Sequence, residues 1–229
     1  MGIYDDKINN KHNYVILGES GSGKTEIALN LAIELSSLSK KDVYFFDMDQ
    51  TKGLFRARDY KDELIKNGVK FVDTFEFMDS PIIPTGISGA LNNKEIICVF
   101  DVGGNAVGAR MIGQFSKYFT IENTDIFYVI NPFRPFSEDI KNINTTMEYI
   151  LSMANVNQEM VKILCNPCMG DDTSEKNVLD GYTWLREKLT ETGKQIYALI
   201  ISNGVNIDDF IKEVKCIIAS INIHIEYIR

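Results

Sequence analysis

The residues that point most directly to a chemistry are the eight that read Gly-Glu-Ser-Gly-Ser-Gly-Lys-Thr near the start of the chain. A glycine-rich turn lets successive backbone N–H groups converge on an anion, and a helix that begins there adds the positive end of its dipole. The lysine would reach the β- and γ-phosphates of a nucleoside triphosphate, and the threonine hydroxyl would bind phosphate-bound Mg2+. We therefore predict a phosphate-binding loop made of Gly18, Glu19, Ser20, Gly21, Ser22, Gly23, Lys24 and Thr25.

The segments on either side of this loop have the patterns that such a loop requires. Residues 14–17 form an apolar run, which predicts a buried strand. Apolar residues recur at helical spacing after the loop, at Ile27, Ala28, Leu31, Ala32 and Leu35. A glycine-rich turn that matched by chance would not be expected to have both neighbours, so the sequence predicts a strand, a phosphate loop and a helix in that order.

Acidic residues follow two other predicted strands. Asp47 and Asp49 come at the end of the apolar run 43–46, and Asp101 follows the run 96–100. Ligands of open parallel sheets bind beyond the carboxyl ends of the strands, where these carboxylates would meet the phosphate loop.

Each of these carboxylates has a role in this interpretation. Asp101 and Asp47 would join Thr25 around Mg2+, and Asp49 would orient an attacking water, so that the catalytic residues are Lys24, Asp49 and Asp101. Gly104 would let the backbone pass close to the γ-phosphate. The alternative for Asp47 and Asp49 is an ordinary turn or cap.

Strand-like and helix-like patterns alternate along the chain, which predicts βαβ units. We expect an α/β three-layer sandwich, with a mostly parallel sheet of about seven or eight strands and helices on both faces, as one domain over residues 1–229. The predicted strands are 14–17, 43–47, 70–73, 96–102, 126–131, 161–166 and 196–201. Helical stripes are formed by Met111, Ile112, Phe115 and Phe119, by Ile140, Ile143, Met147, Ile150, Leu151 and Ala154, and by Val178, Leu179, Tyr182, Leu185 and Leu189.

The C-terminal segment fits two patterns. Phe210, Val214, Ile217 and Ile218 have helical spacing, whereas Ile221, Ile223, Ile225 and Tyr227 alternate as in a strand. We predict a helix followed by a short strand. The alternative of a membrane-targeting helix is disfavoured because no basic face lies opposite the apolar one.

Composition limits the function classes. The 229 residues carry a formal net charge of -8, with 45% hydrophobic and 24% charged residues. This charge argues against a broad nucleic-acid interface, although Lys52, Arg56 and Arg58 could form a local basic patch. No apolar run is long enough to span a bilayer, and the first residues are too polar for a signal peptide, so we expect a cytoplasmic protein.

Together these motifs resemble the partition-type ATPases of the ParA/MinD group, within the CobQ/CobB/MinD/ParA superfamily that is related to nitrogenase iron protein and dethiobiotin synthetase. The resemblance spans nearly the whole chain and is strongest to a bacterial branch with a Phe-Arg-x-Arg element after the second strand. It rests on the phosphate loop and on residues 47–49, 55–58, 100–110, 131–135 and 166–167.

The resemblance implies a P-loop ATPase that binds ATP and Mg2+ and whose slow hydrolysis switches a homodimer or an unidentified protein partner. By similarity, Lys24 and Thr25 bind phosphate and metal, Asp49 assists the water, Asp101 supports Mg2+, and Asn166 reads the adenine edge. ATP is implied because the Asn/Thr-Lys-x-Asp guanine motif is not found. Glu19 departs from the group, which has a lysine there that reaches a partner's phosphates. Either Lys52, Arg56 or Arg58 replaces that lysine, or hydrolysis is slow; these three residues fit the start of a solvated helix equally well.

Three alternatives remain open at this point. The first is a small-molecule kinase or ATP-dependent ligase of the dethiobiotin synthetase type, with residues 74–92 as an irregular pocket wall. The second is a module that holds ATP without turnover. The third is an Fe-S or metal cluster carrier that uses Cys165 and Cys168, although Cys165 is expected to face the sheet. Of the other two cysteines, Cys98 falls in a predicted strand and Cys216 in a predicted helix. This placement of the four cysteines does not resemble the disulfide framework of a secreted protein.

Overall fold

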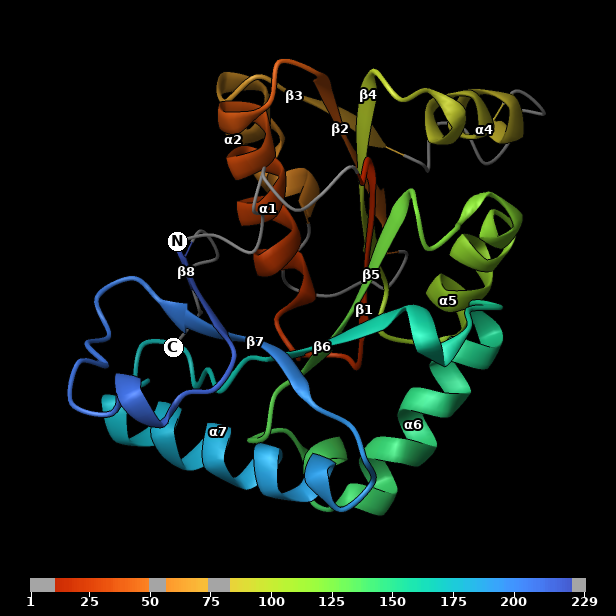
Figure 1. Cartoon of the computed structure of the whole chain (residues 1–229). Coiled ribbons are helices and arrows are strands. Elements are labelled where there is room, and N and C mark those ends of the chain that lie inside the picture. Colours follow the sequence, from red (N-terminus) through yellow and green to blue (C-terminus); the bar gives the residue numbers. More distant parts are fainter. Residues whose placement is uncertain (1–10, 50–56, 74–82, 224–229) are drawn as a thin grey trace.

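One eight-stranded parallel sheet forms the centre of the molecule (Figure 1). The computed structural model describes residues 11–49, 57–73 and 83–223. The strands lie in the order β3-β2-β4-β1-β5-β6-β7-β8, and every neighbouring pair is parallel. Their bounds are β1 Asn13–Gly18, β2 Asp42–Met48, β3 Val69–Asp73, β4 Ile96–Val102, β5 Thr124–Ile130, β6 Val161–Cys165, β7 Ile196–Ser202 and β8 Ile217–Ile221. The parallel sheet predicted from the sequence is confirmed.

Helices cover both faces of this sheet, so the predicted three layers are also confirmed. Helices α1 (Lys24–Leu38) and α2 (Lys61–Lys66) pack on one face. The other face is covered by α4 (Ile83–Asn92), α5 (Ala106–Gly113), α6 (Ile140–Met153) and α7 (Glu175–Thr190) (Figure 1). Short 3-10 turns lie at η1 Ala57–Tyr60, η2 Ser116–Tyr118, η3 Pro135–Ser137, η4 Gln158–Met160 and η5 Ile211–Glu213.

Strand β1 is held at the centre of the sheet because both of its faces are buried. Tyr14 and Ile16 belong to the apolar cluster beneath α1, whereas Val15 and Leu17 belong to the cluster on the opposite face. Each fully buried Val, Leu or Ile side chain contributes about 1.5–3 kcal/mol. This two-sided burial explains the uninterrupted apolar run in the sequence and fixes the point at which the phosphate loop begins.

The helix predicted over residues 210–218 is wrong. Only the 3-10 turn η5 forms there, and Ile217 and Ile218 lie in β8, where they pair with Ala198 and Leu199 of β7. Adjacent isoleucines favour a strand once a neighbouring strand edge is available to pair with. Consequently Cys216 precedes a strand rather than lying in a helix. Ile225 and Tyr227 lie outside the described residues.

Two other local predictions need correction. Helix α5 ends at Gly113, so Phe115 and Phe119 of the predicted stripe follow the helix, although both are buried. Residues 83–92 form a regular helix, α4, rather than an irregular wall, while residues 74–82 lie outside the described part. Lys52 and Arg56 also lie outside it, and Arg58 falls in η1. The stripes predicted around Met147 and Tyr182 are confirmed in α6 and α7.

Candidate nucleotide-phosphate site

The phosphate loop leaves the carboxyl end of β1 through glycines in left-handed backbone conformations. The φ angles are 142° at Gly18, 74° at Gly21 and 95° at Gly23. A Cβ atom at Gly18 would lie 2.5 Å from the carbonyl oxygen of Val129 in β5. Both conformation and space therefore require glycine at this position, and the loop is forced to turn back over the end of the sheet.

Helix α1 starts at Lys24 without a side-chain cap. Its N-cap residue, Gly23, has no side chain to accept hydrogen bonds from the first turn. By contrast, Asn105, Asp139 and Ser174 cap α5, α6 and α7 through side-chain oxygens. The first N–H groups of α1 therefore have no capping oxygen, which is the arrangement that an oxyanion can satisfy.

Lys24 is folded back over this loop. Its Nζ atom donates to the carbonyl oxygen of Glu19 at 2.6 Å, and its side chain is almost fully buried. Burial lowers the pKa of Lys24, while the carboxylates of Asp101, Asp49 and Glu19 oppose that shift. The ammonium group of Lys24 therefore lies close to Asp49 and Asp101, which the sequence analysis predicted to share its site.

Asp47 and Asp101 are direct neighbours across β2 and β4. Both are 1% exposed, and within the described residues neither carboxylate oxygen of Asp101 makes a hydrogen bond of full geometry, although the Thr25 hydroxyl is close enough to stabilise its charge. Burial, followed by the charge of Asp47, raises the pKa of Asp101 to about 7, and the hydroxyl of Thr25 and the charge of Lys24 oppose this. Buried anions require compensation. A divalent cation between Asp101 and Thr25 would supply it, so these residues fit Mg2+.

The segments after β2 and β4 also meet the loop. The backbone N–H of Asp49 donates to Asp47 Oδ1 at 3.1 Å, and a Cβ atom at Gly103 would lie 2.7 Å from Asp49 Oδ1. A Cβ atom at Gly104 would collide with the N atom of Ser20 and lie 2.8 Å from Lys24 Nζ. The structure thus brings Asp49 and Gly104 to the phosphate loop, and only glycine allows this approach at position 104.

Asn166, at the end of β6, contacts the loop from the other side. It is buried, and its Nδ2 atom donates to the carbonyl oxygen of Ser22 at 2.8 Å. Its backbone N–H bonds to Ile130 in β5, which holds the residue at the end of the sheet. The predicted contact with adenine stays a prediction, but one N–H of this amide already supports the loop.

Arg134 is a loop contact that the sequence analysis missed. Its Nε atom donates to the carbonyl oxygen of Gly21 at 3.0 Å. Arg134 lies in the segment after β5, which hydrogen-bonds to the segment after β6 through Asn131 Nδ2 and the Cys168 carbonyl at 2.8 Å. The position of residues 131–135 after an apolar strand could have suggested that they lie near the loop, because that strand, β5, pairs with β1. No spacing rule, however, identifies Arg134 as the residue that contacts the loop.

These observations define a phosphate loop in a parallel α/β sheet with carboxylates on the neighbouring strands. The model of the family described as "CobQ/CobB/MinD/ParA nucleotide binding domain" matches residues 14–219, which is most of the chain. The chain belongs to this family. A comparison with curated proteins finds no match.

One solved structure supports the fold assigned to this CobQ/CobB/MinD/ParA domain. The cell division protein FtsY of Thermotoga maritima matches with a TM-score of 0.51 at 15% identity, covering 88% of this chain and 65% of that one. FtsY of Elizabethkingia anophelis, solved in complex with GDP, matches with a TM-score of 0.41 at 13% identity, over 90% of this chain and 53% of that one. The chain thus spans less than two thirds of either FtsY, and the likeness to the Thermotoga protein shows the fold alone.

Glu19 is the residue at which this domain departs from the lysine pattern of the ParA/MinD group. It is 7% exposed, and burial raises its pKa to about 7, while a hydrogen bond with the Thr146 side chain and the charge of Lys24 oppose this. Thr146 belongs to α6, so Glu19 connects the loop to that helix. Thr146 is a second contact that the sequence did not reveal.

The cysteines do not form a metal site among the described residues. Cys165 is fully buried in the core beneath α6 and α7, as predicted, and burial raises its pKa well above the usual value. Cys168 is 8% exposed, and its sulfur accepts a hydrogen bond from the Gly170 N–H. In the described part of the domain, no three metal-ligating side chains come together. The described residues therefore offer no support for the cluster carrier.

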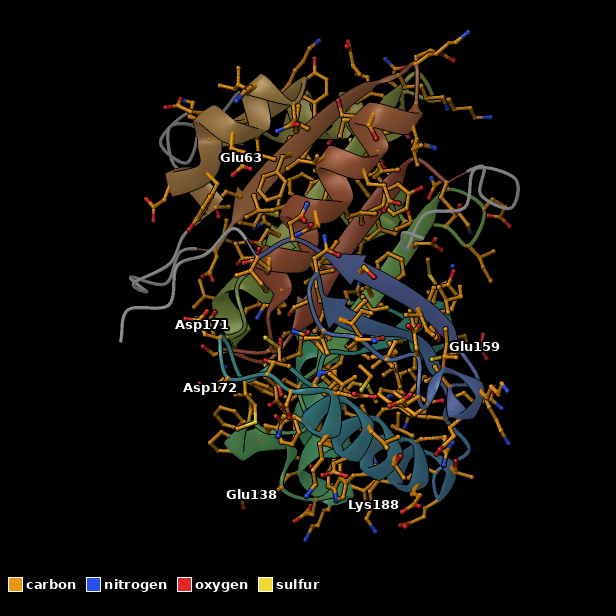
Figure 2. The ribbon with its side chains drawn as sticks, turned by 90° about the vertical axis from the view of Figure 1, so that its left-hand side faces the viewer. Glu63, Glu138, Glu159, Asp171, Asp172 and Lys188 are labelled. Atoms are coloured by element: carbon orange, nitrogen blue, oxygen red, sulfur yellow. The ribbon has the colours of Figure 1, made fainter. Side chains whose placement is uncertain are left out.

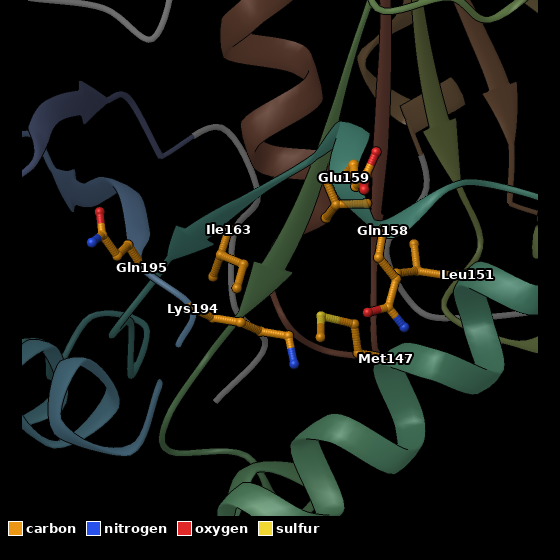
Figure 3. A pocket seen from close by; sticks show the side chains of 8 residues that line it. Met147, Leu151, Gln158, Glu159, Ile163, Lys194 and Gln195 are labelled. Carbon is orange, nitrogen blue, oxygen red and sulfur yellow. The ribbon is translucent and has the colours of Figure 1, made fainter. Parts of the chain in front are cut away.

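A separate hollow of about 280 Å³ lies between α6, η4 and the segment before β7. Figure 3 shows Met147 and Lys194 on either side of it, with Glu159 near its rim. Glu159 precedes β6, whereas Asp171 and Asp172 follow that strand, and Figure 2 shows these two positions on opposite sides of the molecule. The hollow therefore opens at the amino ends of the strands, away from the phosphate loop.

In the described part of the chain, no helix combines the length and the apolar character needed to cross a membrane.

Proposed function

We propose that this domain is a cytoplasmic ATP- and Mg2+-dependent switch that hydrolyses ATP slowly. The observation that carries the proposal is the buried Asp101 carboxylate, which makes no hydrogen bond of full geometry in the described residues and lies beside Thr25 and Lys24 at an uncapped helix N-terminus. A triphosphate with a divalent cation would satisfy both the N–H groups of the loop and this carboxylate.

The residues of the site have distinct tasks in this mechanism. The loop amides and Lys24 bind the phosphates and neutralise the charge that develops at the β–γ bridge. Asp49 orients a water for in-line attack, and Gly104 keeps the backbone beside the loop. Thr25 and Asp101 would hold Mg2+, with Asp47 directly beside Asp101, and the bound cation would add charge neutralisation at the phosphates.

Hydrogen bonds connect the phosphate loop to two exposed surface segments. Arg134 bonds to Gly21, and Asn131 of the same segment bonds to Cys168. Exposed apolar side chains flank these contacts, with Phe133 38%, Phe136 52% and Met169 47% exposed. A change in the loop on hydrolysis would move this surface, which is how we propose that a homodimer or a protein partner senses the nucleotide.

ATP is proposed as the nucleotide because of the residues after β6. Guanine presents N–H donors on its pairing edge, for which a carboxylate is the natural acceptor. Here Asn166 is followed by Pro167, Cys168 and Met169, so no carboxylate stands three residues after the asparagine as in the guanine motif, and Asp171 and Asp172 come later in the segment. The Oδ1 atom of Asn166 would instead accept from the adenine amino group.

Calorimetric titration with ATP and GTP, with and without Mg2+, tests the site. We expect ATP to bind with the support of Mg2+, and Lys24→Ala to weaken it by about 10- to 100-fold, because a charge-assisted hydrogen bond contributes about 1.5–3 kcal/mol. Equal binding by Lys24→Ala would show that the site is misassigned.

Product analysis then separates the switch from the small-molecule kinase or ligase. Slow release of free phosphate without an added acceptor supports the switch. Hydrogen exchange should also differ between the states with ADP and with a non-hydrolysable ATP analogue in the segments containing Phe133 and Met169. Identical exchange in the two states would contradict signalling through this surface.

A further inference from the structure

Arg134 contacts the phosphate loop at its turn, opposite the carboxylates. Its Nε atom lies 3.0 Å from the carbonyl oxygen of Gly21, and a Cβ atom at Gly21 would be 3.7 Å from Nε. The backbone around Arg134 is fixed, since its N–H donates to Asn131 and its carbonyl accepts from Ser137. The guanidinium group is therefore held against the loop by a structured segment.

Most donors of this guanidinium group remain available. Arginine has five N–H donors, and the contact with Gly21 uses the one on Nε. Among the described residues, Arg134 forms no ion pair with a carboxylate within 4.0 Å. Its terminal nitrogens can thus bind an anion in the planar geometry that suits phosphate.

The charge of the site gives this group a role. Lys24 is the cation within the loop. The carboxyl groups of Asp101, Asp49 and Glu19 lie close enough to raise its pKa, so acidic groups surround this single cation. Glu19 belongs to the loop itself and is almost fully buried, so in its ionised form it repels phosphate. A triphosphate would therefore need more positive charge than Lys24 and one Mg2+ supply.

We propose that Arg134 is a second phosphate-binding cation of this site, which offsets the carboxyl group of Glu19 and holds the loop through Gly21. This inference rests on the proposed function and adds a residue that the sequence analysis assigned no role. It places the compensating charge on the segment after β5, whereas the sequence analysis looked for it at Lys52, Arg56 or Arg58.

Binding of ATP with Mg2+ to the whole chain is the test, measured by calorimetry at low and high KCl concentration. We expect Arg134→Ala to weaken binding by about 10- to 100-fold and to reduce its salt dependence, since a charge-assisted contact is lost. Arg134→Lys should retain most of the affinity. Arg134→Gln keeps a donor for Gly21 without the charge and should behave like Arg134→Ala.

A second substitution separates charge from loop support. Adding Glu19→Gln to Arg134→Ala should recover much of the lost affinity, because the repelling carboxylate is removed. Arg186→Ala is the matched control, because that arginine also donates to a backbone carbonyl, that of Glu213 at 3.3 Å, but beside the start of β7. It should bind ATP like the wild type.

The outcomes distinguish this inference from the proposed function. If the wild-type protein does not bind ATP with Mg2+, both are overturned. If it binds ATP and Lys24→Ala does not, while Arg134→Ala binds normally, only the role of Arg134 is overturned. If Arg134→Gln binds like the wild type, or if Glu19→Gln brings no recovery, Arg134 supports the loop without compensating charge and the inference is wrong.

Discussion

Asp101 of β4 lies directly beside Asp47 of β2, and both carboxyl groups are buried at the carboxyl end of the sheet. Two buried anions side by side destabilise the protein unless a cation joins them. The arrangement therefore contributes little to the stability of the nucleotide-free protein, and we interpret it as a binding feature.

Asp101→Asn should stabilise the nucleotide-free protein and impair its response to Mg2+. At pH 8 in EDTA, we expect the free energy of unfolding to rise by about 1–3 kcal/mol, because a carboxyl group whose pKa is raised to about 7 is no longer ionised in the interior. ATP with Mg2+ should raise the melting temperature of the variant less than that of the wild type.

Asp125→Asn is the control for that experiment. Asp125 is also buried, but it forms an ion pair with Lys162 at 2.7 Å, so its loss should lower stability. Unfolding in urea measures both variants. A lower stability of Asp101→Asn in EDTA would contradict the interpretation of Asp101 as an incompletely compensated charge.

Asn166→Ala should weaken nucleotide binding in two separable ways. Loss of the bond to the Ser22 carbonyl loosens the loop and should reduce the affinities for ATP and GTP alike, by about tenfold for one hydrogen bond of about 1–1.5 kcal/mol. Loss of an adenine contact should weaken ATP further. Titration with fluorescent analogues of both nucleotides gives the ratio of the ATP and GTP affinities for the variant and the wild type. An equal loss of affinity for the two nucleotides would exclude the contact of Asn166 with adenine.

Gly104→Ala should abolish nucleotide binding, because the added Cβ atom would collide with the N atom of Ser20 and crowd Lys24 Nζ. We expect a loss of stability of about 1–3 kcal/mol, which is typical of steric overpacking. Gly89→Ala in α4 is the matched control, since nothing lies within 4 Å of its Cβ position and alanine favours a helix by up to about 1 kcal/mol. Thermal unfolding and ATP titration compare the two, and normal binding by Gly104→Ala would refute the close approach.

Local patterns in the sequence pointed to residues that the structure brings to the phosphate loop, while their roles stay predictions. The loop glycines and Lys24 follow from a motif, and Asp49 and Asp101 follow from the ends of apolar strands. The parallel sheet then places those ends together. No spacing pattern indicates which side chain bonds to which carbonyl, so the contacts of Arg134 and Asn166, which span 113 and 144 residues, needed coordinates.

The C-terminal error has a different cause. Ile217 and Ile218 fit a helix with Phe210 and Val214, and they fit a strand equally well. What decides between the two is the unpaired edge of β7, a tertiary feature that periodicity does not report. Likewise, the burial of Glu19 against α6 depends on packing between segments that are far apart in the sequence.

Glu19→Gln should stabilise the nucleotide-free protein at high pH and have little effect at low pH. Burial raises the pKa of Glu19 from 4.5 to about 7 in the folded protein, so the folded state prefers the protonated carboxyl group. The stability associated with that preference is fully present below about pH 4.5 and is lost as the pH rises through 7. Glutamine resembles the protonated carboxyl group at every pH, so the Glu19→Gln variant should retain this stability as the pH rises.

The stability difference between Glu19→Gln and the wild type should therefore grow between pH 5 and pH 8, to about 1–3 kcal/mol after allowance for screening by solvent. Urea unfolding at several pH values in EDTA measures it, and Asp101, present in both proteins, cancels from the comparison. Glu138→Gln, which changes an exposed carboxyl group outside the loop, is the matched control. A constant difference across this range would mean that Glu19 is already ionised in the folded loop, so that its charge acts against phosphate at every pH.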